Sequence, residues 1–131
     1  MRFKEEISAW FPYPDDPDGA EFEFKLLTPG ELAKVQDASF SISFDFTEDE
    51  AGKRIGKSSI VAGREKEIFL ALKNFKNVID ADDTPVPCNN KTRLRPLREA
   101  EGFFLFYEEC RLKLEKIKSD REKNLSDTVK D

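Results

Sequence analysis

The sequence has 131 residues and a formal net charge of −5, with 22 basic residues against 27 acidic ones and no histidine. The surplus of acid argues against nucleic-acid binding, because such proteins need basic surface to neutralise phosphates. The lack of histidine removes the commonest general base and the commonest metal ligand, so any catalysis would fall to carboxylates, lysine, tyrosine or cysteine. We expect no catalytic residue, no metal site and no cofactor. The length fits one domain with one core, and twelve phenylalanines can fill that core.

The two cysteines, Cys88 and Cys110, lie 22 residues apart. The sequence shows no apolar signal segment at its start and no apolar run of about 18 residues, the length that crosses a bilayer. This pattern predicts a soluble, cytosolic protein without membrane contact. Both cysteines are expected to be free thiols, because disulfides are rare in reducing compartments.

The first 19 residues are expected to form an extended arm. Three prolines fall within residues 12–17, and proline fixes the backbone torsion φ and removes an amide donor, so neither a helix nor a central strand is favoured there. The arm carries three aromatic residues, Trp10, Phe11 and Tyr13. Their side chains either pack back on the core or dock on a partner or sister subunit, which makes them candidate partner-binding residues.

Two segments alternate apolar and polar residues with the period of two that is typical of a half-buried strand. In residues 21–26 the alternation places Phe22, Phe24 and Leu26 on one face. Residues 39–46 show the cleanest alternation in the chain, with four large apolar residues on one side and serine or aspartate on the other. We expect these two phenylalanine-rich strands to pair, preferably antiparallel.

A short helix is expected between the two strands. Thr28 can cap this helix, Pro29 suits its first turn, and Glu31 lies at the spacing of a capping box. The helix should end near Asp37, before the second strand.

Residues 51–58 match a permissive phosphate-loop pattern that ends in Lys57 and Ser58. In a nucleotide site, glycine amides wrap the phosphates, the lysine reaches the outer phosphates and the serine binds magnesium. Such a loop should follow directly from a buried parallel strand, whereas here a four-residue segment with three acids follows Phe46. We therefore interpret residues 47–58 as a solvated loop and not as a nucleotide site.

A helix is expected from Ser58 to Phe75. Its apolar face comprises Ile60 or Val61, Ile68, Ala71, Leu72 and Phe75. Pro85 and Pro87 then force a turn over residues 80–87. The aspartates of this turn lack the spacing of a calcium loop, so we interpret them as solvated.

A second, longer helix is expected to start at Pro96, with a kink at Gly102. One of its faces advances by threes and fours and should pack on the core; it comprises Ala100, Phe103, Phe104, Tyr107, Cys110, Leu114 and Ile117. Three further apolar residues are assigned to a second side: Leu105, Phe106 and Leu112. A helix that is apolar on two sides must bury both, so these residues are candidate partner-binding residues, covered either by the strands or by another subunit.

Arg93, Arg95 and Arg98 form the one basic cluster of note, next to the acidic turn. Charge balance within the chain is the simpler interpretation, and an anionic partner is the alternative. From Lys116 the sequence becomes highly charged, and residues 126–131 are expected to form a disordered tail.

Together these elements predict an α+β fold in a single domain over residues 1–125. Two phenylalanine-rich strands with a short intervening helix should pack against two or three C-terminal helices, which cover the apolar face of the sheet.

Four short segments resemble the tail assembly chaperones of long-tailed bacteriophages and prophages. Members of that family carry an N-terminal arm, an element of the Leu-Thr-Pro-Gly-Glu type, a helix that ends in a hydrophobic turn closed by aspartate, a Pro-Val-Pro-like segment and a C-terminal helix that ends near Glu-Lys-Asn. The corresponding segments here are residues 27–31, 75–80, 84–87 and 121–125.

The resemblance implies a non-enzymatic chaperone that binds the long, largely helical tape measure protein, keeps it soluble and helps to recruit the tail tube protein. Such a factor would act as a homo-oligomer in the cytoplasm of the bacterial host and would be absent from the mature virion. Its partners would be polypeptides, with no role for nucleic acid or membrane. A minor tail or head-tail connector subunit that stays in the particle is the alternative.

Overall fold

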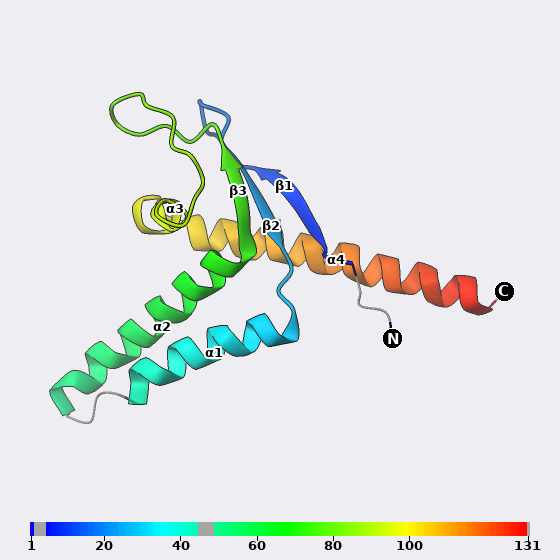
Figure 1. Ribbon diagram of the computed structural model, residues 1–131, viewed down its shortest axis with the longest axis horizontal. Helices are drawn as coiled ribbons and strands as arrows, with labels where there is room; N and C mark the ends of the chain where they lie inside the picture. The colour runs from blue at the N-terminus through cyan, green and yellow to red at the C-terminus, as the bar shows by residue number, and fades with distance from the viewer. Residues whose placement is uncertain (2–4, 45–48, 131) are drawn as a thin grey trace.

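The computed structural model describes the backbone of residues 1, 5–44 and 49–130, and the side chains of these residues except 40–59 and 125–130. The fold is α+β, as predicted, and α4 crosses one face of a three-stranded sheet (Figure 1). In chain order the elements are β1 (Ser8–Pro12), β2 (Glu21–Lys25), α1 (Pro29–Phe44), α2 (Asp49–Ala71), β3 (Leu72–Lys76), α3 (Arg95–Glu99) and α4 (Phe103–Lys130).

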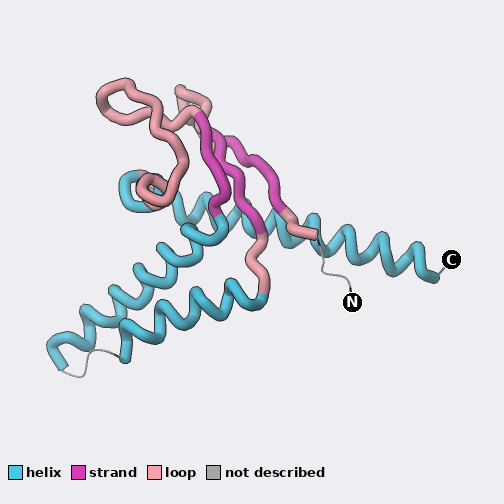
Figure 2. Tube along the Cα trace, in the orientation of Figure 1, coloured by secondary structure: helices cyan, strands magenta, loops and turns pink. Residues whose placement is uncertain are grey.

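The sheet is antiparallel, with strand order β1-β2-β3 and β2 in the centre (Figure 2). The predicted alternation of β2 is confirmed, because Phe22 and Phe24 are buried and their strand neighbours are less buried. Residues 8–12 of the predicted arm are extended and form β1, an edge strand that ends at Pro12. An edge is the position in a sheet where proline is tolerated.

β3 follows α2 without a loop, so the prediction that the helix continues to Phe75 is wrong. The register between β2 and β3 shifts between Glu23 and Phe24 and leaves Lys73 as the extra residue of a β-bulge. The bulge allows both Leu72 and Phe75 to lie on the buried face of the strand, although they are three residues apart. A spacing of three imitates the period of a helix, which explains the wrong assignment.

α1 begins with the predicted capping box. The Thr28 amide donates to Glu31 Oε1 at 3.0 Å, and the Glu31 amide donates to Thr28 Oγ1 at 3.2 Å. These two bonds satisfy amides that have no partner within the helix. The helix then continues past Asp37, its predicted end, to Phe44.

Two predictions for the middle of the chain are wrong. The strand predicted over residues 39–46 is, as far as Phe44, the end of α1. The solvated loop predicted over residues 47–58 is, from Asp49, the first part of α2. Residues 45–48 lie outside the described residues. Because β1 and β3 occupy both edges of β2, the sheet has no position next to β2 for the expected second strand.

α1 and α2 form a helical hairpin that extends away from the sheet (Figure 1). The two helices come so close at Gly63 that a Cβ atom placed there would lie 2.2 Å from Ser39 Oγ. None of the described side chains of α1 is buried, and Leu32, Ile60 and Val61 are exposed. Among the described residues, the hairpin therefore shows a close contact between Gly63 and the Ser39 side chain, and few buried apolar side chains.

The long helix predicted from Pro96 is divided into α3 and α4. Gly102 lies between them with a φ of +80°, in the left-handed region. α3 ends at Glu99, and its C-cap Ala100 is extended, so the helix is broken and not kinked. Glycine adopts a left-handed φ without the steric cost that other residues carry, and Gly102 thus allows the turn that leads directly into α4. α4 then remains helical as far as Lys130, so it includes residues 126–130 of the predicted tail.

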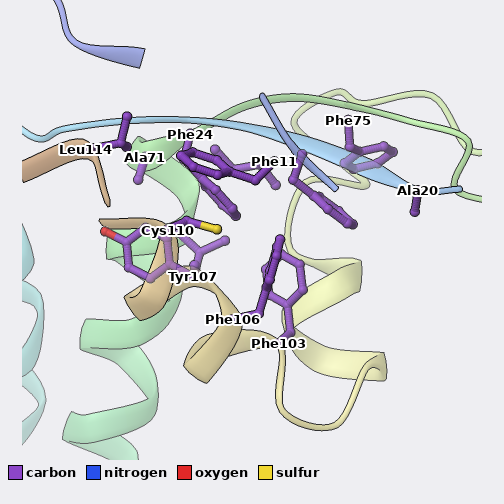
Figure 3. Close-up of a cluster of buried hydrophobic side chains, with 13 residues drawn as sticks. Phe11, Ala20, Phe24, Ala71, Phe75, Phe103, Phe106, Tyr107, Cys110 and Leu114 are labelled. Carbon is purple, nitrogen blue, oxygen red and sulfur yellow. The ribbon is translucent and has the colours of Figure 1, made fainter. Parts of the chain in front are cut away.

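The core lies between the sheet and α4 and consists largely of aromatic rings (Figure 3). Phe24 is fully buried, and its ring packs near those of Phe11, Phe22, Phe103, Phe106 and Tyr107. The predicted core face of the last helix is confirmed. Its buried members are Phe103, Tyr107, Cys110 and Leu114, and its partly buried members are Ala100, Phe104 and Ile117.

The predicted turn over residues 80–87 is present in the segment between β3 and α3. Asp80 Oδ1 accepts hydrogen bonds from the amides of Asp82 at 2.9 Å and Thr84 at 3.1 Å. Asp80 therefore shapes the turn, while Asp82 is exposed.

Candidate partner-binding surface

A groove of about 550 Å³ lies where α3 gives way to α4, and we name it the α3–α4 groove. Its lining includes Leu97, Phe104, Leu105, Arg64 and Arg98. The break at Gly102 sets α3 and α4 in different directions, so that side chains from both helices face the same hollow. Arg64 reaches in from α2, and its guanidinium lies 4.8 Å from the centroid of the Phe104 ring.

Two leucines of α4 have exposed side chains, one in the lining of this groove and one outside it. Leu105 is 67% exposed, and Leu112, two turns further along, is 59% exposed. Residues seven positions apart lie on the same side of a helix. In the described part of the chain no other element covers these two side chains. They form the second apolar side of the helix that the sequence predicts.

Phe106 does not belong to this second side, so its assignment there is wrong. The side chain is 8% exposed, and its ring centroid lies 4.9 Å from that of Tyr13 and 5.9 Å from that of Phe22. Position 106 follows Phe103 by three residues and precedes Cys110 by four. It therefore lies on the same helical stripe as the core residues.

The three aromatic residues of the N-terminal arm are divided between core and surface. Phe11 is buried, and Tyr13 is partly buried and donates its hydroxyl to the Glu101 carbonyl at 3.5 Å. Trp10 is 38% exposed, with Lys76 Nζ 4.8 Å from its ring centroid. Because neighbours in a strand point to opposite faces, Trp10 lies on the face of the sheet away from α4. The structure thus does not bring Trp10 together with the exposed leucines.

Two arginines of the predicted basic cluster are paired within the chain. Arg95 Nε lies 2.6 Å from Glu99 Oε2, and Arg98 Nε lies 2.9 Å from Glu65 Oε1; both contacts raise the pKa of the guanidinium groups. Arg93 instead donates to a backbone carbonyl of α2 at 3.3 Å. Charge balance within the chain therefore holds for Arg95 and Arg98, whose paired carboxylates come from α3 and α2.

The ionisable groups of the core hold the helices together and are poor nucleophiles. The Tyr107 hydroxyl donates to Glu67 Oε2 at 2.6 Å, and burial, followed by this contact, raises the pKa of Tyr107 far above its ordinary value. Burial also raises the pKa of the Cys110 thiol to about 12, which disfavours the reactive thiolate. Cys88 and Cys110 are both free thiols.

The segment that matches a phosphate loop, residues 51–58, lies inside α2. From Lys53 onward the amides of this segment lie past the first turn of the helix, where they donate to carbonyls one turn earlier and are not free to wrap phosphates. Within the described residues, no three acidic or cysteine side chains gather as a set that could hold a metal ion. None of the helices, over those same residues, is long and apolar enough to cross a membrane.

Leu97 and Arg64 are absent from the sequence-based prediction of this surface, and Phe104 is predicted only as a core residue. The signal for the groove was Gly102. If this glycine is interpreted as part of a break between two helices, two short faces replace one continuous stripe, and the hollow between them becomes expected.

Comparison with protein-family models, with curated proteins and with solved structures gives no match to this chain.

Proposed function

We propose that this protein is a non-enzymatic tail assembly chaperone of a long-tailed phage or prophage. It binds the tape measure protein, keeps this long helical polypeptide soluble and assists assembly of the tail tube protein. It acts as a homo-oligomer in the cytoplasm of the bacterial host and is absent from the mature virion. The resemblance of residues 27–31, 75–80, 84–87 and 121–125 to that family supports the proposal.

The observation that carries the proposal is the pair of uncovered leucines on α4. Leu105 and Leu112 keep more than half of their surface exposed on a chain in which 37% of the residues are charged. Two apolar side chains seven residues apart match the repeat of an amphipathic helix, and helical segments are commonly bound through such anchors. Beside Leu105, the α3–α4 groove adds Leu97 and Phe104 to the apolar contact.

Apolar surface of this kind suits a chaperone because it is exposed without being continuous. A large continuous patch on a soluble protein promotes aggregation, whereas isolated apolar side chains do not. Charged residues next to the leucines, such as Glu109 and Lys113, are themselves exposed and interrupt the apolar surface.

The test is co-expression with the tape measure protein encoded by the same phage genome. Leu105→Glu combined with Leu112→Glu should move the client into the insoluble fraction, because charges replace the two apolar contacts. The control combines Asn90→Glu with Ser119→Glu, which adds the same charge at exposed positions outside the α3–α4 groove. Circular dichroism checks that both variants are folded. Equal client solubility with the two variants would show that this surface is not the binding site.

Mass spectrometry of purified virions separates the chaperone from a structural subunit. A chaperone should be present in the infected cell and missing from the particle. A stoichiometric amount of the protein in the particle would instead identify a minor tail or connector subunit.

A further inference from the structure

A second hollow lies between the β1–β2 turn, the segment after β3 and helix α3, and we name it the acidic cleft. Its volume is about 330 Å³. Its apolar lining includes Tyr13, Phe22, Val78, Val86 and Phe103. Because Phe22 and Phe103 are core residues that expose only 4% and 1% of their surface, the floor of the cleft is the outer surface of the aromatic core.

Acidic side chains dominate the polar lining of the cleft, which consists of Asp16, Asp18, Asp80, Glu99, Arg95 and Asn77. Arg95 is held by Glu99 through two contacts, at 2.6 and 3.3 Å, and its charge also interacts with that of Asp80. Among the described ion pairs, none includes Asp16, Asp18 or Asp80. The electrostatic potential of the cleft is therefore negative.

The hydrogen bonds that Asp16 and Asp80 accept come from backbone amides, which are neutral and do not cancel the charge of a carboxylate. Asp16 Oδ2 accepts the Ala20 amide at 2.7 Å, and Asp80 Oδ1 accepts two amides of its own turn. Each bond uses one oxygen of the carboxylate and fixes the side chain at the border of the cleft. The acidic groups are thus positioned by the backbone before any ligand arrives.

An apolar floor with acidic groups around it suits a side chain that has an apolar stem and a cationic end. Lysine and arginine pack their stems on apolar surface while their charged ends reach polar groups. An aromatic ring, such as that of Tyr13, also attracts a cation. Anionic ligands are repelled by the same carboxylates. A volume of about 330 Å³ lies at the small end of ligand-binding pockets and accommodates one long side chain with an apolar neighbour.

We propose that the acidic cleft binds a basic segment of the client polypeptide, in which a lysine or arginine lies next to a large apolar residue. The identity of the client rests on the proposed function, whereas the chemistry of the ligand rests on the cleft itself. The cleft and the α3–α4 groove share a wall that includes Ala100 and Phe103. One client segment can therefore place an apolar face in the groove and a basic residue in the cleft.

The experiment measures fluorescence anisotropy of labelled, capped peptides with the full-length protein and without any client. A peptide of alternating leucine and lysine should bind. A peptide of alternating leucine and glutamate should not bind, and one of alternating serine and lysine should bind more weakly because it lacks the apolar contact. Binding of the glutamate peptide as tightly as the lysine peptide would overturn the proposal, and so would the absence of binding by both.

Matched variants locate the binding site. Asp18→Asn combined with Asp80→Asn should weaken binding of the leucine–lysine peptide about tenfold, since two rim charges are lost while asparagine still accepts the amides of the turn. The control combines Asp82→Asn with Asp83→Asn, which removes the same amount of charge from the turn that holds Asp80, at two positions outside the lining of the cleft. Equal affinity of the two double variants would place the peptide elsewhere and overturn the proposal.

This readout separates the two proposals. Peptide binding that depends on Asp18 and Asp80, together with a client whose solubility does not respond to Leu105→Glu and Leu112→Glu, would support the cleft and contradict the chaperone surface. Peptide binding that does not depend on Asp18 and Asp80, together with a client that becomes insoluble after Leu105→Glu and Leu112→Glu, would contradict only the proposal for the cleft.

Discussion

The aromatic core and the α1–α2 hairpin are built in opposite ways. Between the sheet and α4, Phe24 and Tyr107 are almost completely buried, with their ring centroids 5.1 Å apart. In the hairpin, no described side chain of α1 is buried. The apolar side chains that α2 buries, among those described, are Ile68 and Ala71 at its junction with β3. Within the described residues, the first region is stabilised by buried side chains, whereas the hairpin shows a capping box and the contact between Gly63 and Ser39.

This difference indicates how the domain opens. Burying one large apolar side chain contributes about 1.5–3 kcal/mol, whereas a helix cap contributes about 1 kcal/mol. Regions with few buried apolar contacts open at a lower free energy than the core. We therefore expect the sheet and α4 to unfold together and the hairpin to open separately. Three predictions test this comparison.

The largest effect is expected for Phe24→Ala, at the centre of the core. The variant should lose about 3–5 kcal/mol of unfolding free energy, because it removes a fully buried ring and leaves a cavity. Chemical denaturation measures the loss. Ile60→Ala is the matched change in the hairpin, and it should stay within about 0.5 kcal/mol because Ile60 is 56% exposed. Similar losses for both variants would contradict the comparison.

A smaller and local effect is expected for Gly63→Ala. The new Cβ would lie 2.2 Å from Ser39 Oγ, so either the serine or the helix must shift. We expect a cost of at most about 1 kcal/mol, because the serine side chain can rotate at the expense of its hydrogen bond to Val35 and because alanine favours the helix. Hydrogen exchange should become faster in α1 and α2 and remain unchanged in β2 and α4.

Ser39→Ala provides the control for this clash. In the double variant Gly63→Ala, Ser39→Ala the close oxygen is gone, and alanine is the better helix former at position 63. The double variant should therefore regain the exchange protection of the hairpin. Faster exchange in the sheet after Gly63→Ala alone would show that the hairpin and the core are one cooperative unit.

The smallest effect concerns Glu31 and the start of α1. Burial opposes ionisation of this carboxyl group, but hydrogen bonds from Lys25 and from the Thr28 amide outweigh it and lower the pKa of Glu31 below its ordinary value of 4.5. The folded helix therefore favours the carboxylate, so its contribution is present above pH 4.5 and is lost as the pH falls through the lowered pKa.

Amide exchange in the first turn of α1, measured as a function of pH, checks this expectation. Thr28→Ala should cost about 1 kcal/mol of local stability at neutral pH. Glu31→Gln keeps an acceptor for the Thr28 amide and should remove the pH dependence. If the dependence remains in Glu31→Gln, another group is responsible for it.

The parts of the fold that follow from local patterns could be predicted. The alternation of Phe22 and Phe24, the capping box at Thr28 and the stripe from Phe103 to Leu114 each depend on residues close in sequence. The place of Leu105 and Leu112 outside the core stripe could be predicted for the same reason, whereas the sequence left open whether the strands or another subunit cover them. These features need only the period of a strand or of a helix.

The errors arise where distant segments decide the structure. The alternation in residues 39–46 favours a strand by itself, but β1 and β3 take both edges of β2. The bulge at Lys73 gives a strand the apolar spacing of a helix, and no local feature of Leu72–Lys76 shows which residue of β2 it will oppose. The acidic cleft escapes sequence analysis because it combines residues from three separate segments, and the α3–α4 groove needs Arg64 from α2 beside residues 97–105.

The turn between α3 and α4 requires a residue that adopts a left-handed backbone conformation at position 102. No atom lies within 4 Å of the place where its Cβ would stand, so the corner has room for a methyl group. Only the left-handed φ of +80° excludes an ordinary L-residue. A D-amino acid prefers that same torsion. The wall that the two hollows share should therefore tolerate a D-alanine at position 102 but not an L-alanine, because the restriction comes from the backbone torsion and not from a lack of space.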